Sequence, residues 1–313
     1  MNASPPAQET KSGSPLRLRQ PAVKQAVKKT ASELQEDRAT LIGAGIAFYW
    51  FLALFPGLLA AVGIVGLLPL DPRTVDRLIG GITTALPAGA ADLITGAVEG
   101  ASSGSDGGSV VATVTGIALA LWSASAGFVA MQSGLNVAYE VPRDAKFFKA
   151  RLRAGLLLFA TGILGGTGIA LVVSGRALGN RLEKGLLGDL LGPVFDPLWF
   201  TFRAISAILT LVTLFAIFYY KAPNRDSPRW TWITPGSVVG AAIWLIVSIG
   251  FTLSVRAFGL YGSTYGSLAG VVILLVFLYL TALAVVIGGE LNAELEQSAT
   301  DKRSTGFDAM LIR

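Results

Sequence analysis

Long runs without a single charged residue constrain this chain more than any other feature of its sequence. One run extends from Ser267 to Gly289 with no Asp, Glu, Lys or Arg. A helix that crosses a bilayer needs about 20 mostly apolar residues. Because lipid offers the backbone no hydrogen-bond partners, such a run must pair its own peptide groups within a helix. These runs predict an all-α fold, a polytopic membrane helix bundle.

Six runs are long enough to span a membrane. They are Leu41–Leu70, Val110–Tyr139, Ala154–Gly175, Trp199–Tyr220, Trp232–Val255 and Gly266–Gly289. The fourth run alone contains a charge, Arg203, which lies close to one of its ends. Charged residues make up only 14% of the chain, against about a quarter in soluble domains. We therefore expect six transmembrane helices within a membrane domain covering residues 39–296.

The distribution of Lys and Arg predicts the orientation, because cytoplasmic loops retain basic residues. The N-terminal tail, the loops after the second and fourth runs, and the C-terminal tail together hold 18 of them, whereas the opposite loops hold six. Both termini are therefore predicted to be cytoplasmic. The formal net charge of +5 is explained by these loops and does not indicate a nucleic-acid partner.

The segments outside the runs differ in character. Residues 1–21 are rich in Pro, Ser and Gln and are predicted to be a disordered tail. Apolar residues recur at helical spacing in residues 22–38, which predicts an amphipathic helix lying on the membrane surface. Residues 71–109 suggest two short amphipathic helices, either a cap on the outer face or a lid, and residues 297–313 form a cytoplasmic tail.

The chain contains neither Cys nor His. These absences exclude Ser-His-Asp and Cys-His catalysis, zinc sites of the HExxH type and haem bound through His. We expect no cofactor, no metal site and no catalytic residue. The acids Glu290, Glu294, Glu296 and Asp301 could in principle hold Mg²⁺ for phosphodiester hydrolysis. Acid clusters at helix ends are common, however, and a nuclease site is the weaker interpretation.

Polar residues and a proline interrupt the runs at a few places. Pro56, near the middle of the first run, cannot donate a helical hydrogen bond and is expected to kink or open that helix. Gln132 and Asn136 share one face of the second run with Trp122, Ser125 and Val129. Because amides in hydrocarbon need partners, this face should look into the bundle. It could serve structural hydrogen bonds or line a substrate path.

Three glycines open the sixth run at intervals of four residues, Gly262, Gly266 and Gly270. Small residues at this spacing let a second helix approach closely. The pattern predicts tight helix packing, with a partner helix in the same chain or in another copy.

The sixth run ends on the acids Glu290 and Glu294. Glu290 follows Gly266 by 24 residues, or about 36 Å of helix, which places it at the membrane interface and not deeply buried. Acids are unfavourable near a helix C-terminus and need cationic partners. We expect ion pairs between these acids and the basic loops at 143–153 and 221–229, and Arg151 and Arg153 are the candidate cations.

Three segments resemble the YihY/BrkB family of bacterial inner-membrane proteins. They are GAGIAFYWFLALFPGLL at 43–59, ALALWSASAGFVAMQSGLNVAYEVPRDAKFFKARL at 118–152 and YGSTYGSLAGVVILLVFLYLTALAVVIGGELNAELE at 261–296. The resemblance covers roughly residues 24–296 and implies six spans, both termini in the cytoplasm and a place in the inner membrane. Members carry old labels as ribonuclease BN and as a virulence or serum-resistance factor, neither of which states a mechanism.

Three functions follow as hypotheses. The first is a carrier or flippase for a lipid or another amphiphilic envelope component, with membrane lipids as partners. Its candidate transport or coupling residues are Tyr49, Pro56, Gln132, Asn136 and Glu290. The second is a non-catalytic scaffold that binds an envelope protein or a second copy of itself. The third is a ribonuclease, which the lack of a soluble domain large enough to hold RNA makes the least favoured.

Overall fold

The computed structural model describes residues 20–67, 107–142, 145–183, 194–225, 233–258 and 262–311. Seven helices account for nearly all of these residues, and the described part contains no strand. The helices are α1 (Gln20–Glu36), α2 (Ala39–Leu67), α5 (Gly107–Ala138), α6 (Phe147–Glu183), α8 (Phe195–Lys221), α9 (Pro235–Phe258) and α10 (Gly262–Leu311). The predicted all-α fold is confirmed.

Each predicted span falls largely within one helix, from α2 for the first to α10 for the sixth. Four described segments are long and apolar enough to cross a membrane by length and composition. They are Val114–Ala138, Phe195–Lys221, Pro235–Leu253 and Val271–Ser298. Helix α10 extends well beyond the predicted end of its span, because no proline follows Gly289.

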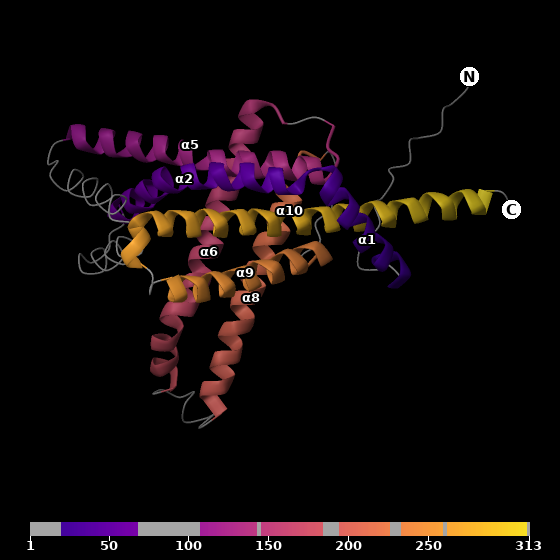
Figure 1. Cartoon of the computed structure of the whole chain (residues 1–313). Coiled ribbons are helices and arrows are strands. Elements are labelled where there is room, and N and C mark those ends of the chain that lie inside the picture. Colours follow the sequence, from indigo (N-terminus) through magenta and orange to yellow (C-terminus); the bar gives the residue numbers. More distant parts are fainter. Residues whose placement is uncertain are drawn as a thin grey trace, which may run out of the picture.

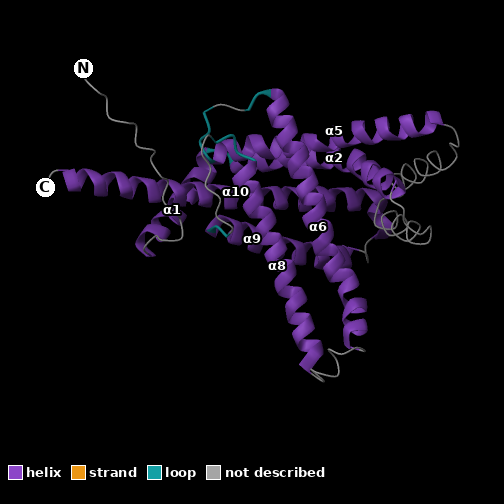
Figure 2. Cartoon of the chain, turned by 180° about the vertical axis from the view of Figure 1, so that it is seen from behind, coloured by secondary structure: helices purple, strands orange, loops and turns teal. Residues whose placement is uncertain are grey.

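The helices form two sets that cross each other (Figure 1). Helices α2, α5, α9 and α10 run side by side across the view, while α6 and α8 form a hairpin that crosses them at a steep angle and extends beyond them. Figure 2 shows the same crossing from behind. Helix α10 lies at the centre and contacts α1, α2, α5, α8 and α9. Many of the buried residues that the structure describes, between Ala282 and Leu295, belong to this helix.

Two turns shape the end of the molecule where α1 lies. Arg38, with a φ of 52°, separates α1 from α2, so that α1 can turn back onto α10. Glu140, with a φ of 49°, ends α5, and the Val141 amide donates to the Asn136 carbonyl at 2.8 Å. This pattern is a Schellman cap with a non-glycine residue in the left-handed position.

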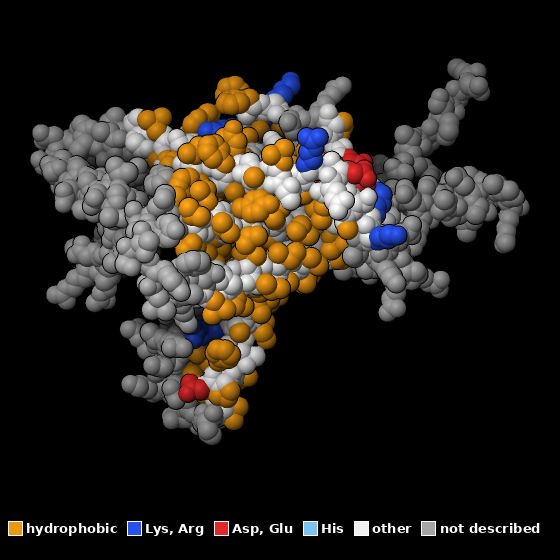
Figure 3. Space-filling model, in the orientation of Figure 1, with side chains coloured by type: hydrophobic (Ala, Val, Ile, Leu, Met, Phe, Trp, Pro, Cys, Tyr) orange, Lys and Arg blue, Asp and Glu red, His pale blue; other side chains and the backbone are white. Residues whose placement is uncertain are grey.

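Hydrophobic side chains cover the middle of the visible face and continue along the α6–α8 hairpin (Figure 3). Most charged side chains visible there gather toward α1 and the start of α6. The predicted amphipathic helix is present as α1, packed on α10 and α2; its place on a membrane surface stays a prediction. Of the tail predicted at 1–21, residues 1–19 lie outside the described residues, and so do residues 71–106 of the loop predicted at 71–109.

Candidate functional site

The segment of α10 from Gly288 to Leu295 is buried throughout. A helix buried on all sides at a polar segment must satisfy its side chains inside the protein. Protein encloses Glu290, whose side chain is only 2% exposed; its predicted place at the membrane interface stays a prediction. Sequence spacing alone placed this residue along the helix axis but could not show that other helices cover it.

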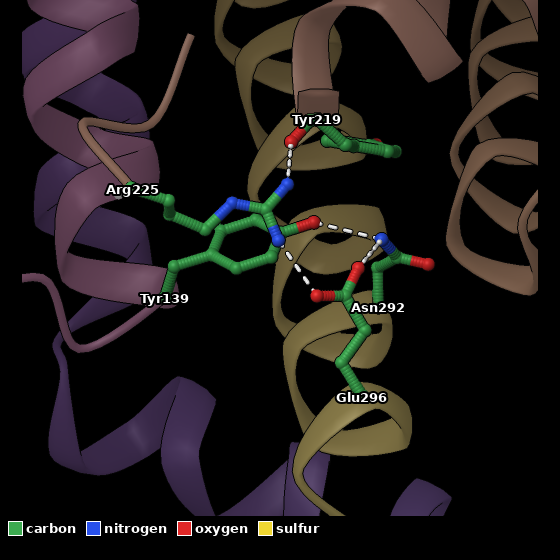
Figure 4. A network of polar contacts seen from close by, with 5 residues as sticks. All are labelled: Tyr139, Tyr219, Arg225, Asn292 and Glu296. Carbon is green, nitrogen blue, oxygen red and sulfur yellow. Dashed lines mark hydrogen bonds and ion pairs between the residues drawn. The ribbon is translucent and has the colours of Figure 1, made fainter. Parts of the chain in front are cut away.

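A network of polar contacts joins α10 to the ends of α5 and α8 (Figure 4). Arg225 pairs with Glu296, with 2.6 Å between Nη1 and Oε2. Its Nη2 donates to the Tyr219 carbonyl at 2.7 Å, and its guanidinium lies 4.4 Å from the centre of the Tyr139 ring. Asn292 donates to the Tyr139 hydroxyl at 2.8 Å and to Glu296 at 3.1 Å. The arginine thus connects three helices.

Burial sets the electrostatics of this network. The side chains of Arg225 and Glu296 are 15% and 28% exposed, so that each charge depends on the other for the solvation it has lost. The Tyr139 hydroxyl takes part through its oxygen, which accepts from Asn292. The network therefore acts as a polar clamp among α5, α8 and α10.

A second contact fastens α1 to α10. Lys29 Nζ lies 2.7 Å from Oε1 of Glu294 and 3.6 Å from Oε1 of Glu33. The hydrogen bond to Glu294 raises the pKa of Lys29. The structure thus assigns Glu294 a partner on α1, where Arg151 and Arg153 had been predicted.

Those two arginines have other contacts. Arg153 donates to the Asn224 side chain at 2.9 Å, and Arg151 donates to the Trp122 carbonyl and stacks on its ring at 4.5 Å from the centroid. Of the basic loops, the one after α8 supplies Arg225, which pairs with Glu296.

Glu290 faces other acids. Its carboxyl group lies near that of Asp37, and its Oε1 atom is buried without a hydrogen-bond partner. Two ionised carboxylates repel each other, so that this proximity favours a proton on one of them. Among the described residues, no three acidic side chains are placed together to hold a metal ion.

This geometry predicts the effect of neutralising Glu290. We expect Glu290→Gln to retain the fold and to raise the unfolding temperature in detergent by about 2–4 °C, because the amide can donate to Asp37 and the repulsion disappears. The unfolding temperature is measured by heating the protein and monitoring its intrinsic fluorescence. Glu290→Ala, which leaves a cavity beside Asp37, is the comparison, and equal destabilisation by both variants would contradict the repulsion between the two acids.

The polar residues of the predicted α5 face are buried, whereas Trp122 on the same face is 48% exposed. Gln132 and Asn136 are 3% and 6% exposed. Gln132 donates to the Ala150 carbonyl at 3.1 Å, and the Asn224 amide donates to the Asn136 side chain at 2.8 Å. Both amides join α5 to neighbouring segments, to the start of α6 and to the segment after α8. Their predicted part in transport stays a prediction.

Two apolar grooves flank α5. The α2–α5 groove has a volume of about 490 Å³ and is lined by Ile42, Tyr49, Val129, Val137 and Arg151, among others. The α5–α6 groove has a volume of about 760 Å³ and is lined by Leu121, Trp122, Phe148, Arg151, Leu152 and Phe159, among others. Arg151 therefore contributes to both grooves. Volumes of about 300–1,000 Å³ are typical of ligand pockets.

The remaining predicted residues are placed as follows. Tyr49 is 48% exposed on the α2–α5 groove. Helix α2 continues through Pro56 to Leu67, so that Pro56 does not end the helix; a kink there stays a prediction. Gly262, Gly266 and Gly270 lie in the first turns of α10, and their packing lies outside the described part of the structure.

The sequence analysis missed a close packing of α9 on α10. A side chain on Gly236 would overlap the carbonyl oxygen of Gly288, and one on Gly288 would overlap the Tyr219 hydroxyl and lie 3.1 Å from the Cα atom of Gly240. The spacing of Gly236 and Gly240 is the same small-residue pattern that was noticed at Gly262. It could therefore have been found from the sequence.

Comparison with known proteins decides the family. The family model described as "Virulence factor BrkB" matches residues 30–311, which is most of the chain. The chain belongs to the BrkB family. It is a membrane protein of that family, and the resemblance noted in three segments of the sequence is confirmed.

Curated relatives of this BrkB family member include proteins from several bacteria. The chain is 32% identical over 254 residues to the "Putative ribonuclease-like protein YfkH" of Bacillus subtilis (strain 168), covering 81% of this chain and 89% of that protein. It is 26% identical over 268 residues to a UPF0761 membrane protein of Azoarcus sp. (strain BH72), covering 82% and 60%. A UPF0761 membrane protein of Tolumonas auensis is 36% identical over 76 residues, covering 24% and 25%. No solved structure matches the chain.

Proposed function

We propose that this protein moves a lipid or another amphiphilic envelope component across a bacterial inner membrane, which it crosses six times with both termini in the cytoplasm. The observation that carries the proposal is the pair of apolar grooves on the two sides of α5. An amphiphile needs an apolar surface for its chains and a polar point for its headgroup. The α5–α6 groove supplies Leu152 and Phe159 for the first and Arg151 for the second.

The proposed orientation rests on charge. Basic residues lie at one end of the molecule: Lys29 in α1, Lys146 and Lys149 at the start of α6, and Arg225 after α8. Basic residues of short loops stay in the cytoplasm. The same end of the molecule holds the polar clamp and the Lys29–Glu294 pair. The cytoplasmic half would then be the rigid half, and movement would occur along the apolar part of α5.

Reconstitution into liposomes tests the function. We expect vesicles that contain the protein to move headgroup-labelled envelope lipids between leaflets at least about tenfold faster than empty vesicles. A groove with a polar point for the headgroup lowers the free-energy barrier to its passage through the hydrocarbon. A fluorescent lipid with an impermeant quencher outside the vesicles reports the movement. Rates equal to those of empty vesicles for every envelope lipid would favour a scaffold that binds a second copy or another envelope protein.

A ribonuclease is not proposed for this chain. The acids at the end of α10 are directed to different partners, Glu294 to Lys29 and Glu296 to Arg225. A carboxylate committed to an ion pair is a poor ligand for Mg²⁺, which needs several free oxygen atoms. The word ribonuclease in the name of the Bacillus relative describes that protein alone.

A further inference from the structure

Arg151 carries a charge that no described acidic residue balances. The ion pairs of the described residues are Lys29–Glu33, Lys29–Glu294 and Arg225–Glu296, and none of them includes Arg151. Its Nε atom is buried without a hydrogen-bond partner. A guanidinium nitrogen that has lost water without gaining an acceptor is in an unfavourable state.

The one described acceptor of Arg151 is shared. The Trp122 carbonyl receives a hydrogen bond from Arg151 and a second one from the Ser125 hydroxyl at 2.7 Å. Guanidinium groups have five N–H donors in a planar fork that matches carboxylate and phosphate oxygens. Stacking on the Trp122 ring orients this fork, and most of its donors are left for a ligand.

The surroundings of Arg151 are apolar and aromatic. Both grooves beside α5 reach its side chain. Phe147 and Phe148, in the first turn of α6, are 64% and 79% exposed, and the Phe147 ring lies 6.2 Å from that of Trp122. Aromatic rings next to basic residues are typical of the headgroup region of a membrane protein. The charge therefore lines an apolar groove and lies against the Trp122 ring.

We propose that Arg151 binds the phosphate of a single anionic lipid whose acyl chain lies in the α5–α6 groove. This inference rests on the proposed function and names its substrate class, an amphiphile with a phosphate headgroup. The phosphate supplies the missing anion, and Leu121, Leu152 and Phe159 enclose the chain. Lys149, two residues before Arg151, is exposed and lines neither groove.

The groove favours a lipid over a soluble anion. Its lining is mostly apolar, and such a surface stabilises a bound alkyl chain in proportion to the area removed from water. A free phosphate ion would gain the contact with Arg151 alone and would leave the groove unfilled. Charge and shape together therefore select a molecule that is anionic at one end and apolar at the other.

Quenching of Trp122 fluorescence by brominated acyl chains tests the assignment. The full chain is placed in nanodiscs with dibrominated phosphatidylglycerol or dibrominated phosphatidylcholine, and the Trp122 signal is the difference from Trp122→Phe. We expect half-maximal quenching at an about tenfold lower fraction of phosphatidylglycerol, the selectivity that one charge-assisted hydrogen bond provides. Arg151→Gln should remove this preference, and Arg151→Lys should retain part of it.

Lys149→Gln is the matched control, because it removes an exposed charge from the same helix without touching a groove; it should keep the preference. Equal quenching by both lipids in the wild-type chain would overturn the inference even if Arg151→Gln fails to fold. Loss of quenching in millimolar inorganic phosphate would overturn it in favour of a soluble anion. Lipid movement without headgroup preference would refute the inference and leave the proposed function intact.

Discussion

Gly288→Ala is expected to destabilise the protein by about 1–3 kcal/mol, the range for overpacking a close helix contact. A single methyl group at this position would overlap the Tyr219 hydroxyl and the Gly236 carbonyl oxygen and would press on Gly240. The backbone atoms among these neighbours belong to α9 and cannot rotate away. Helices α9 and α10 would have to separate, and the effect is measured as the free energy of unfolding in detergent.

Gly116→Ala, on α5, is the matched control. A methyl group there meets no described atom within 4 Å, and alanine is favoured over glycine within a helix by about 0.5–1 kcal/mol. The two variants therefore have opposite predicted signs for the same chemical change. If Gly288→Ala also stabilised the protein, the close packing of α9 on α10 would be wrong.

Arg225→Ala should have the second large effect, a loss of about 3–5 kcal/mol, as for one partner removed from a buried ion pair. The variant leaves Glu296 enclosed without its cation and takes away the group stacked on Tyr139. The clamp on α5, α8 and α10 would open at the end where α1 lies. Unfolding in denaturant, followed by intrinsic fluorescence, gives the value.

Two further variants make this result specific. Arg225→Met combined with Glu296→Leu should recover most of the loss, because apolar side chains of similar size leave no unpaired charge. Lys221→Ala removes an exposed cation, whose Nζ atom lies 4.8 Å from the centre of the Tyr220 ring. The free energy of unfolding should change by no more than about 0.5 kcal/mol. A loss for Lys221→Ala as large as that for Arg225→Ala would show that net charge, and not the clamp, is responsible.

The helices could be predicted from the sequence because the signal is local. Each apolar run carries its own requirement for backbone hydrogen bonds, so that its length predicts a helix without knowledge of its neighbours. The continuation of α10 past Gly289 follows from the lack of a helix breaker in that segment. The crossing of α6 and α8 over the other helices depends on which faces pack together, which no single run contains.

The contacts of the polar residues could be predicted only in part. The burial of Gln132 and Asn136 followed from the high cost of an unpaired amide in hydrocarbon. The partner of Glu294 could not be deduced, because several basic segments are predicted on the same side and only the fold selects Lys29 from them. Asn292 was passed over in the sequence, although it contacts both Tyr139 and Glu296.

Movement of lipid by variants that fill the α5–α6 groove tests the central claim most directly. Gly155 lines this groove, and a Cβ atom there would meet no described atom within 4 Å, so that we expect Gly155→Phe to extend into the groove and to leave the fold intact. We predict that liposomes with Gly155→Phe lose at least about 90% of the lipid movement of the wild-type protein, since the path is occupied. Gly116→Phe, outside both grooves, should keep its rate. Equal movement by Gly155→Phe and the wild-type protein would contradict the account.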